Sequence, residues 1–121
     1  MMFPYQRFRA WQLSHELVQA VYRSTASWPK SERYELTSQT RRSAYSIPMN
    51  IAEGSAKRGS PEFRRYLDLA LGSCSELSYC LLLSRHLGYM SNAEWDDLAR
   101  LRNHTGQLVW KLHEATRSKA R

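Results

Sequence analysis

Apolar residues recur at spacings of three and four in four segments of the chain, and no long segment alternates with a spacing of two. Between Phe63 and Leu81 the apolar positions keep a heptad spacing for almost three heptads. This periodicity places the apolar side chains along one face of an α-helix. The pattern therefore predicts four amphipathic helices, roughly at residues 6–26, 37–58, 61–87 and 92–117.

Residues that start and stop helices lie at the ends of these segments. Thr37 and Ser60 can cap the second and third helices by accepting hydrogen bonds from their first N–H groups. Gly88 can take the left-handed conformation that ends a helix, and Ser91 and Glu94 have the spacing of a capping box. Because the connections are short, neighbouring helices are expected to be antiparallel. The predicted fold is all-α, an up-down-up-down four-helix bundle.

Chain length and cysteine content add further expectations. The 121 residues have the size of one domain, residues 1–121. The chain starts without an apolar signal region, and its longest apolar cluster is too short to span a bilayer, so a cytoplasmic protein without membrane contact is expected. Cys74 and Cys80 are six positions apart and fall on different faces of a helix, which indicates reduced structural thiols.

Pro48 lies inside the second predicted helix, where it removes a hydrogen bond to the carbonyl of Ala44 and clashes with it. One solution is a break, with Asn50 capping a short new helix. The other is a continuous helix with a kink, in which Ser46 or water serves the free carbonyl. The kinked helix is favoured, because a restarted helix of about two turns is too short to be stable alone.

The stretch around Pro48 also contains small residues. Gly54 and its small neighbours allow another helix to approach, and Gly72 and Ser73 offer a matching surface on the third helix. A phosphate-binding loop is not indicated, because the stretch has no glycine-rich run and no GxxxxGK[ST] motif between a strand and a helix.

The sequence from Glu35 to Leu77 resembles the four-helix-bundle family first noticed as reading frames inside intervening sequences of 23S ribosomal RNA. Accessory proteins of diversity-generating retroelements are similar to this family. The segments AWQLSHELVQAVY and WPKSERYEL also match, so the resemblance covers most of the chain, although Glu35 replaces a usual glycine. The motif residues present are Gln39, Arg42, Ser46, Ile47, Asn50, Ile51, Ala52, Glu53, Gly54, Phe63, Ala70, Ser73 and Glu76.

The resemblance implies an assembly more than an activity. Members of the family resemble one another as four-helix subunits of five-fold, barrel-like oligomers, so a homopentamer is implied here. The retroelement relatives bind nucleic acid and a reverse transcriptase, whereas most other members have no known activity. Nucleic acid and such a polymerase are therefore candidate partners.

Patterns for catalysis and metal binding are weak in this sequence. A di-metal site in a four-helix core needs a Glu-x-x-His spacing, which none of the 4 histidines has. Serines are plentiful, but none lies in a nucleophile motif. A non-enzymatic protein without metal or cofactor is expected. An enzyme is the third possibility, and it requires a polar pocket with a perturbed carboxylate at Glu53 or Glu76.

Four polar residues on the second and third helices have matching spacings. Asn50 and Glu53 are three positions apart, and so are Ser73 and Glu76. They could form a ligand or acid–base site, but a hydrogen-bond network between helices or subunits is the favoured interpretation, because buried polar groups need partners. The predicted structural network consists of Gln39, Ser46, Asn50, Glu53, Ser73 and Glu76.

The net charge of +7 indicates an anionic partner such as nucleic acid. In the predicted topology one end of the bundle gathers ten Lys and Arg residues against four acidic residues, a difference of +6, which leaves +1 for the other half. Arg41 and Arg42 are second choices for phosphate binding, because they can equally complete the polar network. The first-choice phosphate contacts are Lys57, Arg58, Arg64 and Arg65.

These features predict a non-enzymatic, homo-oligomeric bundle that binds RNA or DNA backbone through a basic rim. Assembly side by side around a ring axis brings the basic ends of all subunits onto one rim, where phosphates bind with little reading of the bases. The alternative is a protein-interaction scaffold whose ring docks an acidic partner, such as a polymerase surface, without direct nucleic-acid binding.

Overall fold

The computed structural model describes the backbone of residues 2–120 and the side chains of residues 2–117. Within this range the chain has four α-helices, two short 3-10 helices and no strand. The prediction of an all-α chain with four helices is confirmed. The elements are η1 (Pro4–Arg7), α1 (Arg9–Thr25), η2 (Lys30–Glu32), α2 (Leu36–Ser55), α3 (Ser60–His86) and α4 (Asn92–Ala120).

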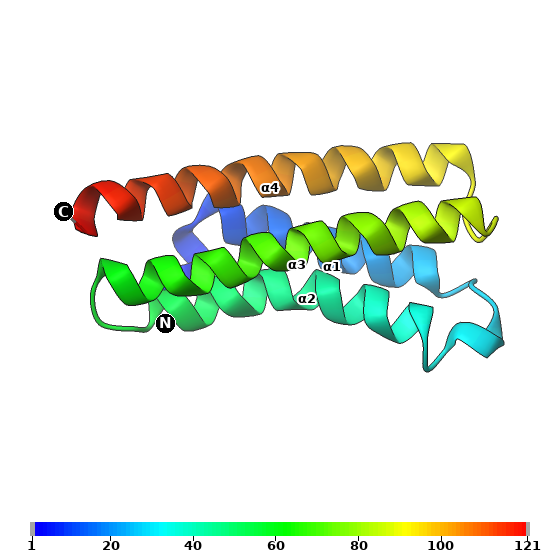
Figure 1. Ribbon diagram of the computed structural model, residues 1–121, viewed down its shortest axis with the longest axis horizontal. Helices are drawn as coiled ribbons and strands as arrows, with labels where there is room; N and C mark the ends of the chain where they lie inside the picture. Colours follow the sequence, from blue (N-terminus) through cyan, green and yellow to red (C-terminus); the bar gives the residue numbers. More distant parts are fainter. Residues whose placement is uncertain (1, 121) are drawn as a thin grey trace.

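The four helices lie side by side along the long axis of the molecule (Figure 1). Following the chain, α1 and α3 run from left to right in this view, and α2 and α4 run from right to left. Each helix packs against the next one, and α4 also packs against α1. The left end of Figure 1 therefore holds the end of α2, the start of α3 and the end of α4. We call it the basic end.

The core is built from the apolar faces of all four helices. Leu17 of α1, Ile47 of α2, Leu67 of α3 and Val109 of α4 are fully buried. Burial of one such side chain contributes about 1.5–3 kcal/mol, so the apolar faces hold the helices together. On α2 the buried face includes most of the predicted positions, namely Thr40, Ala44, Ile47 and Ile51.

Three of the predicted helix boundaries are three residues off. The fourth helix ends at Ala120 and not at residue 117. The first helix begins at Arg9 and not at residue 6, because Pro4 starts a 3-10 turn and Phe8 is extended, with φ −75° and ψ 127°. The second helix ends at Ser55 and not at residue 58. Lys57 and Arg58 consequently lie in the α2–α3 loop.

The predicted caps have mixed outcomes. Ser91 and Glu94 form the capping box, with hydrogen bonds of 3.1 and 3.2 Å between each side chain and the other residue's N–H group, and Gly88 has the expected positive φ of 79°. Thr37 and Ser60 are not N-caps, because each lies inside its helix. Gly59 precedes α3 with a φ of 83°, a conformation that residues with side chains rarely adopt.

Pro48 lies within α2, which continues from Leu36 to Ser55 without a break. The alternative of a new helix capped by Asn50 is therefore not adopted, and the kink at Pro48 stays a prediction. The hydroxyl of Ser46 does not serve the carbonyl of Ala44, because it donates to Ser43 O at 3.3 Å and to Ser73 Oγ at 2.6 Å. Buried apolar residues on both sides of Pro48 keep α2 on the core.

Gly54 sets the closest approach between α2 and α3. A Cβ atom at this position would lie 2.6 Å from Cβ of Tyr66 and 3.0 Å from Cδ1 of Phe63. Cβ of Tyr66 is tied to the backbone of α3, so it cannot turn away. Gly72 and Ser73 were both expected to help form this contact. A Cβ added at Gly72 would meet nothing within 4 Å, so only Ser73 contacts α2.

Replacement of Gly54 by alanine is expected to destabilise the fold by about 1–3 kcal/mol, because the added methyl group separates α2 from α3. Gly106→Ala on α4 is the matched control, since a Cβ at Gly106 meets nothing within 4 Å. The control should stabilise the protein by about 0.5–1 kcal/mol through lower chain entropy. Urea unfolding measures both, and a Gly54→Ala protein as stable as wild type would contradict the close approach.

Cys74 and Cys80 are free and buried. Burial raises the pKa of the Cys74 thiol to about 11, although the charge of Arg102 partly offsets this rise. Burial also raises the pKa of the Cys80 thiol. Neither thiol therefore carries much thiolate near neutral pH, which agrees with a structural role.

Alkylation by iodoacetamide should be slow in the folded protein at pH 8. A thiol of pKa about 11 has about 100-fold less thiolate there than one of pKa 9. The Cys80→Ala variant isolates Cys74, and its reaction rate should keep rising with pH up to about 11, whereas the urea-unfolded variant should level off earlier. Equal rates in the folded and unfolded variant at pH 8 would contradict the burial of Cys74.

Candidate nucleic-acid interface

The first-choice phosphate contacts come together at the basic end (Figure 1). Lys57 and Arg58 lie in the α2–α3 loop, and Arg64 and Arg65 lie in the first turns of α3. The end of α4 adds Arg117. Lys119 and Arg121, which were also assigned to this end from the sequence, lie outside the residues whose side chains the structure describes.

The ring of Tyr66 brings two of these cations together. Nζ of Lys57 lies 5.5 Å from the ring centroid, and Cζ of Arg65 lies 4.6 Å from it. Each contact is a cation–π interaction worth about 0.5–1 kcal/mol at an exposed site. The two contacts hold the α2–α3 loop against the first turns of α3, so the cations of both segments form one surface.

The other two arginines differ in their surroundings. Arg58 is exposed. Arg64 is half-buried, and its Nε is fully buried without a hydrogen-bond partner among the described residues. Arg65, by contrast, lies 3.4 Å from a carboxylate oxygen of Glu62, which raises the pKa of its guanidinium further above the ordinary value.

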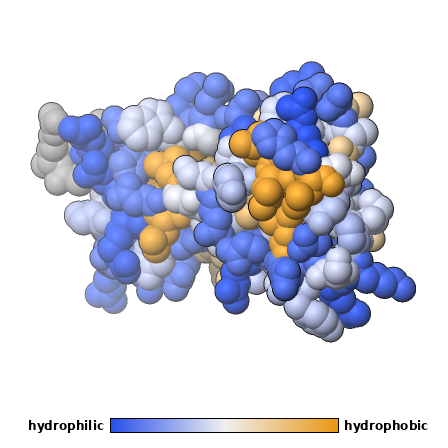
Figure 2. Space-filling model, turned by 45° about the vertical axis from the view of Figure 1, so that its right-hand side comes forward, coloured by the Kyte–Doolittle hydropathy of each residue, from blue (hydrophilic) through white to orange (hydrophobic). Residues whose placement is uncertain are grey.

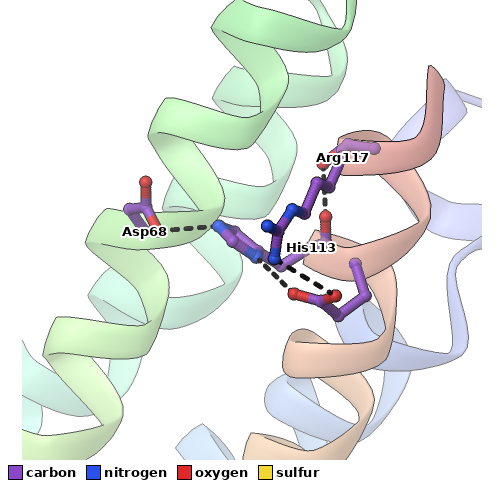
Figure 3. A network of polar contacts seen from close by, with 5 residues as sticks. Asp68, His113 and Arg117 are labelled. Carbon is purple, nitrogen blue, oxygen red and sulfur yellow. Dashed lines mark hydrogen bonds and ion pairs between the residues drawn. The ribbon is translucent and has the colours of Figure 1, made fainter. Parts of the chain in front are cut away.

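Two acidic residues at this end, Asp68 and Glu114, both contact the side chain of His113 (Figure 3). His113, only 6% exposed, has Nε2 at 2.7 Å from Oδ1 of Asp68 and Nδ1 at 3.7 Å from Oε1 of Glu114. The geometry is that of a close polar contact and not of an aligned hydrogen bond, because neither ring nitrogen has a hydrogen-bond partner among the described residues. Arg117 lies 4.0 Å from the same Glu114 carboxylate.

Three of the four acidic residues assigned to this end thus have a basic or histidine neighbour, and Glu53 is exposed. Most of the cations remain without such a partner. Within the described residues, the basic side chains of this end that form no ion pair are Lys57, Arg58, Arg64 and Lys111. Arg7, just before α1, and Arg9, its first residue, form none with the described residues either.

The second-choice residues lie far from this surface. Arg41 is near the start of α2, and its Nε donates to Oγ1 of Thr25 at 2.8 Å. Fourteen helical positions separate it from Ser55, a distance of about 20 Å along the axis. Arg42 is exposed. Neither arginine completes the polar network on α2 and α3 through a hydrogen bond in the described chain.

Five of the six predicted network residues form side-chain hydrogen bonds, in two separate groups. Between α2 and α3, Gln39 donates to Glu76 at 2.8 Å, and Ser46 donates to Ser73 at 2.6 Å. Within α2, the side chain of Asn50 donates to the carbonyl of Ser46 at 2.7 Å. Glu53 is the exception, since it is exposed and no hydrogen bond of its side chain joins it to the described residues.

Sequence reasoning missed two features of the basic end. No sequence motif points to Tyr66, whereas the structure places two cations over its ring. The Asp68–His113 contact joins residues 45 positions apart. The proximity of Tyr66 to Lys57 and Arg65 could have been suspected from the short loop, but no sequence signal pairs Asp68 with His113.

The fold and this surface define a small basic four-helix protein. The model of the 23S rRNA-intervening sequence protein family matches residues 6–111, and the chain belongs to that family. A solved structure is similar: the crystal structure of a protein with unknown function from the S23 ribosomal protein family of Bacteroides thetaiotaomicron VPI-5482. It has a TM-score of 0.77 and 20% identity, over 86% of this chain and 97% of that chain.

A search of curated proteins gives no match. Among the helices that the structure describes, none combines the length and apolar character needed to cross a membrane.

Proposed function

We propose that the protein is a non-enzymatic, homo-oligomeric helical bundle that binds the backbone of RNA or DNA through its basic end. This proposal rests on the ion pairs at the basic end, which involve most of its acidic side chains but few of its basic ones. The acidic residues there are mostly engaged by neighbours, while Lys57, Arg58 and Arg64 form no ion pair among the described residues. Their charge is therefore available to phosphates.

Binding of this kind depends on charge and not on base sequence. Exposed lysine and arginine side chains displace counterions from phosphates, so affinity falls as salt rises. Lys57 and Arg65, held over one tyrosine ring, supply two neighbouring cations with limited freedom. Contacts of lysine and arginine to phosphates position a nucleic acid without reading its base edges.

A homo-oligomer, expected to be a pentamer from the family resemblance, multiplies this surface. Large apolar side chains on the outside of α2 and α3 support an assembly: Met49 is 60% exposed, Leu69 48% and Tyr79 65%. Hydrophobic areas also interrupt the polar surface on the face drawn in Figure 2. Exposed apolar surface of this kind is typical of sites of protein–protein contact. In a ring whose subunits are parallel, the basic ends of all subunits lie on the same rim.

Reversal of two exposed charges tests the basic end. Lys57→Glu with Arg58→Glu should weaken binding of labelled single-stranded RNA and duplex DNA by at least about tenfold, and should make the salt dependence shallower, because fewer phosphates are neutralised. Fluorescence anisotropy across a salt series measures both quantities.

The matched control is Arg23→Glu with Arg100→Glu, two exposed residues away from the basic end with the same change in charge. It should bind almost as well as wild type. Equal weakening in both double variants would mean that only net charge matters. Absence of binding by wild type near physiological salt would overturn the proposal.

The mass in solution tests the assembly. Light scattering with size-exclusion chromatography should give about five times the chain mass of 14.2 kDa. Leu69→Glu should lower that mass, because it places a charge among the exposed apolar side chains, without loss of helical signal in circular dichroism. A wild-type protein that has the mass of one chain at micromolar concentration would contradict the proposed homo-oligomer.

A protein-interaction scaffold is the second candidate. In that function the same basic end docks an acidic protein surface, such as that of a polymerase, and nucleic acid is not bound directly. The nucleic-acid titration separates the two functions, since the scaffold function requires no binding of RNA or DNA by the protein alone.

A further inference from the structure

The end of the bundle opposite the basic end contains a pocket that the proposed function does not use. It lies where α1 is followed by α2, at the right of Figure 1, and has a volume of about 200 Å³. No acidic residue is part of its lining. The polar residues that line it include three cations, one indole and two hydroxyl groups, from Lys30, Arg33, Arg41, Trp28, Thr25 and Thr37.

Arg41 is held in place at this pocket. Its Nε donates to Oγ1 of Thr25 at 2.8 Å, and its Cζ lies 4.6 Å from the ring centroid of Tyr22. The hydroxyl of Thr25 is itself fixed, because it donates to the carbonyl of Val21 at 2.8 Å. The two terminal nitrogens of Arg41 donate to none of the described residues. A guanidinium oriented in this way is preorganised to bind an oxyanion.

Trp28 gives an independent sign of a ligand. Its side chain is only 6% exposed and lines the pocket, yet its Nε1–H has no acceptor among the described residues. The indole nitrogen can only donate, and a buried donor without a partner costs about 1–3 kcal/mol. The ring is also packed against Tyr89, with centroids 5.9 Å apart. Trp28 is therefore a residue of the pocket lining whose buried donor no described residue satisfies.

The start of α2 adds backbone donors beside the same pocket. Glu35, at the N-cap position, makes no side-chain cap hydrogen bond. The N–H of Leu36 donates to the Glu32 carboxylate at 3.3 Å, whereas those of Thr37 and Ser38 have no acceptor among the described residues. The partial positive charge at the start of a helix favours an anion there.

Among the described residues, nearby carboxylates form no ion pair with the cations of the pocket. Both oxygens of Glu32 are engaged, one by the N–H of Leu36 and the other by the hydroxyl of Tyr89 at 2.8 Å. This hydrogen bond raises the pKa of Tyr89, which therefore stays protonated and keeps donating. Glu35 is exposed and does not line the pocket. Within the described chain no ion pair involves Lys30, Arg33 or Arg41.

We propose that this pocket binds a phosphate group, either as free phosphate or as the terminal phosphate of a nucleic-acid strand. Three cations line it, from the connection between α1 and α2 and from α2 itself. A terminal phosphate carries a charge of about −1.5 to −2 at pH 7 and has three acceptor oxygens, so it matches this set of donors better than a carboxylate does.

Calorimetric titration with inorganic phosphate, at pH 7 and at ionic strength held constant with chloride, tests the site. Lys30→Gln with Arg33→Gln, both exposed positions, should weaken phosphate binding by at least about tenfold. Trp28→Phe removes the N–H donor together with part of the buried ring volume, and it should weaken binding about threefold. Circular dichroism confirms that each variant is folded.

The matched control is Arg23→Gln with Arg100→Gln, two exposed residues that neither line this pocket nor lie at the basic end. It removes the same charge and should leave phosphate affinity unchanged. Equal weakening by the pocket and control variants, or no binding heat with wild type at millimolar phosphate, would overturn the proposal.

Two short strands of one sequence identify the source of the phosphate, one with a 5′-phosphate and one with a 5′-hydroxyl. Tighter binding of the phosphorylated strand by wild type, but not by the Lys30→Gln/Arg33→Gln variant, assigns the pocket to a strand end. Equal binding of the two strands, together with retained binding of inorganic phosphate, assigns it to free phosphate.

Discussion

The contact between α2 and α3 is the constraint on which the rest of the structure depends. It is closest at Gly54, where any side chain would collide with Tyr66, and it is tied farther along by the 2.6 Å hydrogen bond from Ser46 to Ser73. These contacts fix how far one helix is displaced along the other. The loop between them then has to place Lys57 over the ring of Tyr66. The geometry of the basic end is therefore a consequence of packing between two helices.

The helices themselves could be predicted because periodicity reports burial directly. Residues such as Ile47 and Leu67 were assigned to apolar faces and are fully buried. Boundaries were less predictable, because they depend on the backbone conformation of single residues. Gly59, with a φ of 83°, takes the capping position expected for Ser60. At Pro48, by contrast, a single residue does not set a boundary. Proline disfavours a helix, but packing on the core keeps α2 continuous through it.

The candidate sites were predictable only in part, for a related reason. A loop and the helix that follows it share an end of the bundle by topology, so Lys57 and Arg64 could be placed together from the sequence. Contacts between segments distant in the sequence have no such signal. Arg41 was grouped with phosphate or network residues of α2, but its partners are Thr25 and Tyr22 of α1.

The two ends of the bundle use positive charge in different ways, which the net charge of +7 does not reveal. At the basic end the cations without acidic partners are mostly exposed, so their attraction is long-ranged, tolerant of geometry and screened by salt. At the opposite end Arg41 is oriented by a hydrogen bond and by an aromatic ring, beside a buried indole N–H. Directed donors of that kind select one oxyanion at short range. The two proposals therefore assign a long polyanion and a single phosphate group to different residues of one chain, so that they do not compete.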